Sequence, residues 1–296
     1  MYVLLLAALV SVGAALEPAP ATPCTHVASR GSDLDGFVNG LQPGDVGCLR
    51  AGRYGARASR TAWQVSGTAS APITLQGYPG EARPVILGSF VFEGDHLTGS
   101  GLVFDGPPGA AGSDYAISVW VTGDDDELRN SEVREAESQG IYLDGADRVR
   151  LVGNYIHHNG DTDDPTVANL HHGIYFASGS GLIADNLIVR NYSFGVHLYP
   201  SARDVLVVQN TIVGHGRAGV IIAGEPGQPV PAFNRVVGNV IASNAQQAVT
   251  SYGPLGFGNV VEHNVVWANG TAGQTRGLAM RANFELPPRL PGVMAR

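Results

Sequence analysis

Lysine is absent from this sequence of 296 residues, so all 18 basic residues are arginines and one common catalytic base is excluded. Charged residues make up only 15% of the chain, and the formal net charge is −8. This balance argues against a general binder of nucleic acids or anionic membranes. Glycine (40 residues) and proline (18 residues) are abundant instead, as in turn-rich β proteins.

Long hydrophobic runs are also missing, apart from one apolar stretch between Tyr2 and Val12. That stretch is too short to span a membrane as a helix, and small residues follow it up to Ala15. We therefore predict a signal peptide over residues 1–16 and a secreted, periplasmic or cell-surface protein with no stable membrane insertion. The alternative is an apolar segment that caps the fold.

Cysteine is scarce, since Cys24 and Cys48 are the only two. In an oxidising compartment they should form a disulfide that staples the N-terminal end. Such a bridge contributes about 2–4 kcal/mol of stability. A reduced, buried pair is the alternative if the protein stays inside the cell.

Five stretches of the chain repeat one pattern, in which a glycine or alanine, an alternating strand and a turn precede an asparagine. The strands read GIYLDG, GIYFAS, GVHLYP, GVIIAG and AVTSYG. The repeated asparagines are Asn154, Asn186, Asn210, Asn239 and Asn264. A second polar column follows five residues after each, at Asn159, Asn191, His215, Asn244 and Asn269. Alternation with a period of two, broken by glycine and asparagine turns, predicts strands and excludes helices.

The repeated asparagines are 32, 24, 29 and 25 residues apart, which fits one coil of about three short strands per repeat. Asparagine suits the corners because it tolerates the left-handed region, and its amide can bond to the next coil. Stacked coils share one continuous core that a single coil cannot form. We predict an all-β fold, a single-stranded right-handed parallel β-helix. A leucine-rich repeat is disfavoured because its LxxLxLxxN spacing is absent.

The repeats resemble those of secreted right-handed parallel β-helix proteins of the pectate-lyase-like superfamily. The run QPGDVGCLRAGRYGARASRTAWQVSGTASAPITLQGYPGEARPVILGS is similar to the first coils of its chondroitinase-B-like and alginate-lyase-like branch. Together these similarities cover about Leu41 to Gly270. The resemblance implies the fold but leaves the chemistry open, because the superfamily includes lyases, hydrolases, epimerases and binding proteins.

We expect one monomeric β-helix domain over residues 17–296. Its expected parts are a capped start at 24–100, regular coils at 97–270 and an irregular tail at 271–296. Two insertions interrupt the coils at different corners, at 160–171 and at 225–234. Long connections on a rigid scaffold are where function concentrates.

Alternation also predicts which side chains face solvent. Because neighbouring coils lie about 4.8 Å apart, Tyr142, Tyr175 and His197 should stack as one outward row. The residues expected to surround this row are Asp144, His171, His172, Tyr199, Arg203 and Arg217. Such a surface resembles the groove in which superfamily members hold extended sugar chains.

In that interpretation, Tyr142, Asp144, His171 and Arg217 bind substrate, with aromatic faces for sugar rings and arginine for carboxylates or sulfates. Two simpler interpretations remain open. Tyr142 and Tyr175 are also typical surface residues of strands, and His171 and His172 could cap the loop through backbone hydrogen bonds.

Three carboxylates, Asp161, Asp163 and Asp164, lie close together in the first insertion. Oxygen ligands of this kind suit Ca²⁺, so the sequence predicts a calcium site there, against the alternative of a solvated acidic loop.

The leading functional hypothesis is a polysaccharide lyase that cleaves a uronic-acid-containing polymer by β-elimination. Arg203, Arg217 or Ca²⁺ would neutralise the carboxylate, His197 or His172 would act as base, and Tyr175 or Tyr199 would act as acid. One alternative is a glycoside hydrolase that uses Asp144 with an aspartate of residues 161–164. The other is a non-catalytic β-helix that binds glycan or protein through the same surface.

Overall fold

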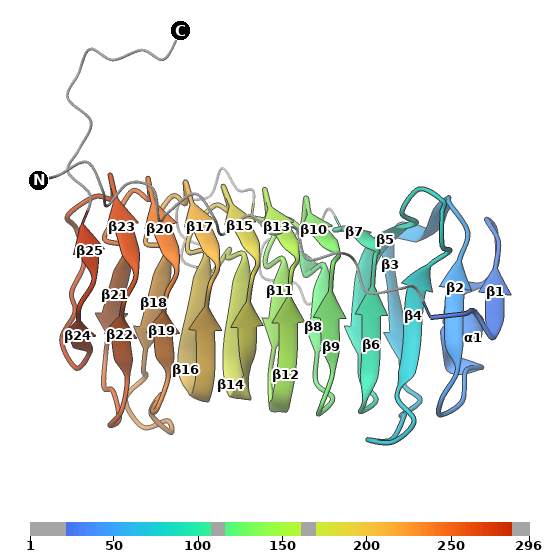
Figure 1. Ribbon diagram of the computed structural model, residues 1–296, viewed down its shortest axis with the longest axis horizontal. Helices are drawn as coiled ribbons and strands as arrows, with labels where there is room; N and C mark the ends of the chain where they lie inside the picture. Colours follow the sequence, from blue (N-terminus) through green and yellow to red (C-terminus); the bar gives the residue numbers. More distant parts are fainter. Residues whose placement is uncertain (1–21, 108–115, 161–169, 286–296) are drawn as a thin grey trace, which may run out of the picture.

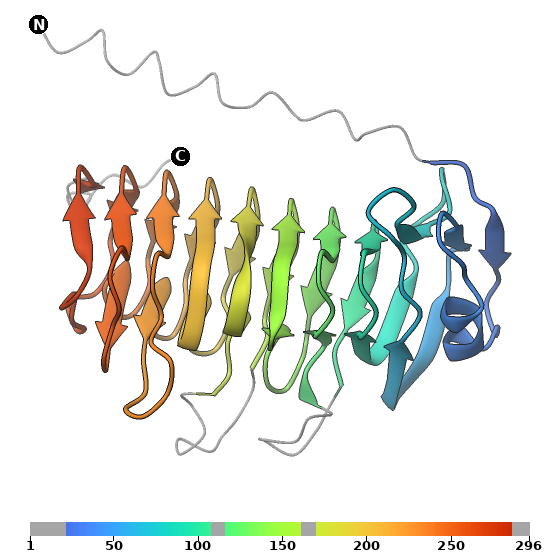
Figure 2. The ribbon, with the colours of Figure 1, turned by 90° about the horizontal axis from the view of Figure 1, so that it is seen from below.

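The computed structural model describes residues 22–107, 116–160 and 170–285. Within them, short strands follow one another around a coil, and each pairs in parallel with the equivalent strand of the next coil. Figures 1 and 2 show the coils stacked along the long axis, from β1 at the N-terminal end to β25 at the other. The predicted all-β parallel β-helix is confirmed.

The strands form three faces, numbered here in the order in which a coil visits them. Face 1 contains β1 (His26–Ala28), β2 (Val46–Leu49), β4 (Ile73–Gly77), β6 (Leu97–Ser100), β9 (Glu127–Arg129), β12 (Ala146–Val152), the second halves of β14 (Ile174–Ala184) and β16 (Val196–Val208), β19 (Arg235–Val237), β22 (Val260–Glu262) and β24 (Ala279–Arg281). Face 2 contains the first parts of β3 (Arg53–Trp63) and β5 (Val85–Phe92), then β7 (Val103–Asp105), β10 (Glu132–Arg134), β13 (Tyr155–His157), β15 (Leu187–Val189), β17 (Thr211–Val213), β20 (Val240–Ala242), β23 (Val265–Trp267) and β25 (Phe284–Glu285). Face 3 contains the second parts of β3 and β5, then β8 (Val119–Val121), β11 (Ile141–Leu143), the first parts of β14 and β16, β18 (Val220–Ala223) and β21 (Val249–Tyr252).

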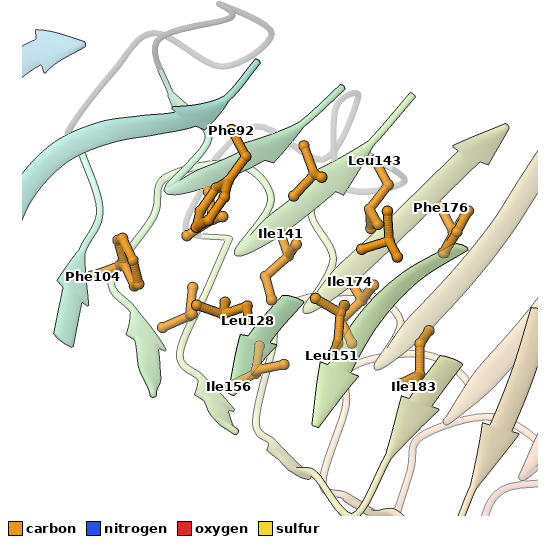
Figure 3. Packing of buried hydrophobic residues seen from close by; sticks show 14 of the residues in the cluster. Phe92, Phe104, Leu128, Ile141, Leu143, Leu151, Ile156, Ile174, Phe176 and Ile183 are labelled. Carbon is orange, nitrogen blue, oxygen red and sulfur yellow. The ribbon is translucent and has the colours of Figure 1, made fainter. Parts of the chain in front are cut away.

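The core is a set of apolar columns that run through the stack. Ile141 pairs with Ile174, which pairs with Val196, and all three side chains are fully buried. Figure 3 shows these columns pointing into the interior from successive coils. No coil buries these side chains alone, so the core exists only when neighbouring coils are stacked in register.

Asparagine ladders close two corners of the stack, as the sequence predicts. The backbone N–H and the side-chain amide of Asn210 both donate to Oδ1 of Asn239, each at 2.9 Å. The ladder runs through Asn154, Asn186, Asn210, Asn239, Asn264 and Asn283. In the second ladder His215 replaces an asparagine, and its Nδ1 accepts from the backbone N–H of Asn191 at 3.1 Å. A short third ladder, Asn234 to Asn259, was not anticipated.

The N-terminal end is closed by α1 (Leu34–Asn39), which buries Leu34 and Val38 against the core. The predicted disulfide between Cys24 and Cys48 is present, with an S–S distance of 2.04 Å, and it ties the residues before β1 to β2. Residues 1–16, the predicted signal peptide, lie outside the described residues. Nowhere in the described part of the chain is there a helix long and apolar enough to cross a membrane.

The coils continue beyond residue 270, where the sequence analysis placed an irregular tail. β24 pairs with β22, and β25 pairs with β23. Asn283 extends the first ladder by accepting from Asn264 at 3.0 Å. The pattern was missed because Glu285, two residues after Asn283, stands where the earlier coils carry isoleucine or valine, as at its pairing partner Val266.

Asp126 is a buried acid at a corner of the coil, where the ladders have an asparagine. Oδ1 of Asp126 accepts from the backbone N–H of Leu97 at 2.8 Å, but the buried Oδ2 has no hydrogen-bond partner in the described chain. Burial, with a smaller contribution from Asp95 and its neighbours, raises the pKa of Asp126 to about 8. Asn234 occupies a similar corner position, and there the amide Nδ2 donates to the carbonyl of Ala202 at 2.9 Å.

The first prediction concerns the main ladder. Asn239→Ala removes both the acceptor of Asn210 and the donor to the buried carbonyl of Val207. Stranding buried backbone groups costs about 1–3 kcal/mol each, so we expect a loss of roughly 3 kcal/mol in urea unfolding. Thr211→Ala, on the outer side of adjacent β17, is the control. A loss no larger than the control's would show that the ladder does not stabilise the stack.

The second prediction concerns Asp126. The unfolded carboxyl loses its proton near pH 4, whereas the folded carboxyl keeps it up to about pH 8. Between these values the folded state binds more protons, so this group lowers stability as pH rises. We expect Asp126→Asn to stabilise the protein progressively from pH 4.5 to pH 8, by at most roughly 1.4 kcal/mol per pH unit. Asn234→Asp adds a second buried acid, so it should destabilise the protein relative to wild type, progressively as pH rises. If the stabilities of wild type and Asp126→Asn depend on pH in the same way, the assignment is contradicted.

Candidate functional site

The outward row predicted on face 3 is present in the described strands. Tyr142 pairs with Trp120 on one side and with Tyr175 on the other, and Tyr175 pairs with His197. The row continues through Ile221 and Thr250. Ring centroids are 5.4 Å apart for Trp120 and Tyr142, and 5.1 Å apart for Tyr142 and Tyr175. One aromatic ladder therefore runs along the outside of the β-helix.

At its C-terminal end this ladder becomes a cluster around His197. The rings of Tyr175 and Tyr199 both stack on His197, with centroids 5.1 and 5.2 Å away and interplanar angles of 18° and 21°. Phe194, from the turn before β16, lies 5.3 Å from the same imidazole. His197 is only 8% exposed as a result, so the expectation of a fully wetted row is wrong at this position.

His172 packs edge-on against His197 and shares a hydrogen bond with it. Nε2 of His172 lies 2.9 Å from Nδ1 of His197, so a single proton lies between the two rings. Burial lowers the pKa of His172 well below its ordinary value, and the neighbouring His197 adds to this effect. Burial alone holds the pKa of His197 at about 3. Both imidazoles are therefore neutral at neutral pH.

The two tyrosines of the cluster keep their protons. Burial raises the pKa of Tyr175 well above its ordinary value, and Tyr142, Tyr199 and two carboxylates add to the shift. The pKa of Tyr199 is also raised, first by burial and then by a hydrogen bond that its hydroxyl donates to Oε2 of Glu225 at 2.8 Å. The cluster thus combines neutral histidines with protonated phenols.

A cavity of about 470 Å³ opens over this cluster. His172, Tyr175, His197 and Tyr199 line one side, and Arg217 lines it from the turn before β18. The guanidinium of Arg217 lies 5.8 Å from the centroid of Phe194 and pairs with no carboxylate of the described residues. The remaining lining residues are Leu170, Phe194, Ile221, Ala223, Gln246, Thr250, Ser251, Tyr252, Gly273 and Gln274.

Several residues predicted for the site do not line this cavity. Arg203 instead lies over the ring of Phe233, at 5.5 Å. Asp144 accepts hydrogen bonds from Ser178 at 2.8 Å and Tyr142 at 3.3 Å, near the β11–β12 turn. His171 is buried beside Tyr192, with ring centroids 6.1 Å apart. These side chains follow corners that turn away from the cavity, which alternation within a strand does not predict.

Glu225 is a residue that the sequence analysis missed. It begins the second insertion, residues 225–234, which joins β18 on face 3 to β19 on face 1. The length of that insertion was the available signal, but its contact with Tyr199 depends on how the loop folds back. Gln246 and Gln274 were also missed, because they come from turns outside the repeated strands.

The predicted calcium ligands Asp161, Asp163 and Asp164 lie outside the described residues. Among residues 22–107, 116–160 and 170–285, no group of three acidic, histidine or cysteine side chains is placed to hold a metal ion. The expectation of Ca²⁺ in the first insertion therefore stays a prediction.

A third prediction follows from the buried histidine pair. In NMR titrations of the folded protein, we expect the rings of His172 and His197 to show no protonation between pH 8 and pH 5, because burial disfavours the charged forms. The same rings should titrate near pH 6.5 in denaturant, which serves as the control. Between about pH 6.5 and 3 the unfolded chain binds more protons at His197, so this group lowers stability as pH falls. Titration of either ring near pH 6.5 in the folded state would contradict the buried geometry.

Solved structures share this fold at low sequence identity. A pectate lyase, Pel9A, matches with a TM-score of 0.66 and 13% identity, over 90% of this chain and 78% of its own. An alginate lyase from Paenibacillus sp. str. FPU-7 matches with a TM-score of 0.57 and 15% identity, over 88% of this chain and 99% of its own. The periplasmic alginate epimerase AlgG matches with a TM-score of 0.53 and 12% identity, over 81% of this chain and 62% of its own.

A search of curated proteins found no match to the sequence. The family model described as a right handed beta helix region, in contrast, matches residues 117–280. This segment covers more than half of the chain and includes the histidine cluster and every described residue that lines the cavity. The chain belongs to the right-handed β-helix family.

Proposed function

We propose that the face 3 cavity is the active site of a polysaccharide lyase that cleaves a uronic-acid-containing polymer by β-elimination. The observation that carries this proposal is the neutral His197 in contact with two protonated tyrosines, in a cavity whose described lining has one cation and no carboxylate. The pectate lyase, alginate lyase and alginate epimerase of the same fold supply the polymer class by analogy.

Arg217 would bind and neutralise the uronate carboxylate. Its guanidinium has no acidic partner in the described chain, so it is available to form an ion pair with a bound carboxylate. Neutralisation lowers the energy of the carbanion-like transition state that forms when the proton at C5 is removed.

His197 would be the base. Its Nδ1 bonds to His172, which leaves Nε2 to take the C5 proton when the shared proton lies on Nδ1. A carboxylate bound to Arg217 would cancel the guanidinium charge that lowers the pKa of His172, and so would favour a proton on the histidine pair, as proton abstraction requires. His172 would then be a positioning residue that stabilises the charged ring through the shared hydrogen bond.

Tyr175 or Tyr199 would be the acid. Both phenols keep their protons and stack against the base, and Tyr199 would exchange its hydrogen bond to Glu225 for one to the leaving oxygen. The C5–H and C4–O bonds break, a C4–C5 double bond forms, and the leaving oxygen takes the phenol proton. The proton from C5 resides on His197, and its return to the phenolate, directly or through solvent, restores both groups.

Calcium and export complete the proposal. Asp161, Asp163 and Asp164 would hold Ca²⁺, an ion that can contribute to carboxylate neutralisation in such a reaction. The Cys24–Cys48 disulfide suits a secreted or periplasmic monomer, since such bonds persist in oxidising compartments.

The hydrolase alternative finds less support in the described residues. No aspartate or glutamate lines the cavity there, and Asp144 is engaged by Ser178 and Tyr142 instead. The binding alternative is supported by the aromatic ladder from Trp120 to Tyr199, which extends beyond the cavity and offers stacking faces without requiring chemistry.

The test is a screen of the purified protein against polyuronates, with and without EDTA, that follows unsaturated ends by ultraviolet absorbance. We expect turnover, and a fall in kcat/KM of roughly 100-fold or more in Arg217→Gln and in Tyr175→Phe or Tyr199→Phe, whichever is the acid. Arg235→Gln, which breaks an exposed pair with Glu262 on face 1, is the matched control. Binding without unsaturated product would support the non-catalytic alternative, and reducing ends without unsaturation would support the hydrolase.

A further inference from the structure

The side chains that point outward from face 3 change from aromatic to aliphatic one coil after His197. Upstream, the row carries Trp120, Tyr142 and Tyr175, whereas β18 places Ile221 next to His197. Ile221 and Ala223 form an apolar cluster with Phe194 and Ala218 that is separate from the main core, and Tyr199 packs against it. Because this cluster lies on the outer side of the coil, stacking of the coils does not require it to be apolar.

The cluster forms the floor of a recess between two tyrosines. Ala223 pairs with Tyr252, and Tyr199 follows Leu198, which pairs with Ile222, so Ala223 lies between the two tyrosines in the stack. Two strand spacings separate those tyrosine positions, about 9.6 Å. Tyr252 is 65% exposed, whereas Ile221 and Ala223 are 7% and 2% exposed, so the floor lies below the tyrosine rims.

A sugar ring would bind more favourably to other surfaces of this cavity than to the recess. Its C–H faces favour the aromatic surfaces of Tyr199 and Tyr252, and its hydroxyls can reach the amide of Gln246 or Gln274. The floor of the recess carries only apolar groups, and the carboxylate of Glu225 at one rim is engaged by the hydroxyl of Tyr199. The recess therefore fits a small apolar substituent that projects from a sugar ring.

We propose that this recess holds the methyl group of an O-acetyl ester, so that the site selects acetylated uronate units. The inference rests on the proposed function, because it takes Arg217 as the carboxylate ligand. An acetyl ester on a hydroxyl leaves the carboxylate free to bind Arg217, whereas a methyl ester on the carboxylate would remove that charge. The cavity thus matches a ligand with one anionic group and one apolar substituent.

Ile221→Val and Ile221→Thr give a matched pair for testing this assignment. Valine and threonine have nearly the same shape, but threonine places a hydroxyl on the recess floor. Pressing a methyl group against a hydroxyl that lacks a partner disfavours binding. The same comparison at Ala223→Ser provides a second position, and Val213→Thr makes the same change on half-buried β17 of face 2, away from the cavity.

The experiment measures Kd and kcat/KM for O-acetylated polymannuronate and O-acetylated polygalacturonate, each before and after mild saponification. We expect the acetylated form of the true substrate to bind more tightly than its saponified form. For that acetylated form, Ile221→Thr should bind about 5–10-fold more weakly than Ile221→Val, and after saponification the two variants should differ less than two-fold.

Each other outcome has a distinct meaning. Equal binding of acetylated and saponified polymer, or an equal difference between the two variants on both forms, would overturn the recess assignment and leave the proposed function standing. Failure of every polymer to bind in either form would overturn both. A loss in Val213→Thr as large as that in Ile221→Thr would place the effect outside the cavity and would also overturn the assignment.

Discussion

The structure depends on the satisfaction of buried backbone groups at the corners of each coil. A chain that turns back over its own core leaves N–H and C=O groups inside the stack, where water cannot reach them. At a ladder corner, one asparagine accepts from the backbone of the preceding coil and donates to a carbonyl, as Asn239 does for Asn210 and Val207. The same bonds hold adjacent coils in register, so corner chemistry and strand pairing reinforce each other.

That register determines what the outer surface can be. Parallel, in-register coils bring residues from sequence positions about 22–33 apart into contact, as Tyr142, Tyr175 and His197 illustrate. Aromatic rings in such a row stack on one another and exclude water from their neighbours. The low pKa of His197 follows from its burial in this row, because Tyr175, Tyr199 and Phe194 all pack against its ring.

The sequence predicted the positions of side chains on strands, but not of side chains at corners. Tyr175 and His197 could be placed because alternation within a strand and a constant coil spacing determine which row a residue joins. Arg203 could not, since it follows a corner and its guanidinium lies over Phe233 rather than at the cavity. Glu225 was missed for the same reason, because a loop return and not a repeat brings it to the hydroxyl of Tyr199.

The sequence alone determined the coil, its asparagine corners and the order of side chains along face 3. These features depend on local alternation and on a repeat, both of which are visible in one dimension. Only the tertiary structure decided that His172 meets His197, that Arg217 lines the same cavity, and that Ile221 and Ala223 form an apolar recess beside them. Those contacts join different coils and corners, and their burial depends on the packing of all the neighbouring side chains at once.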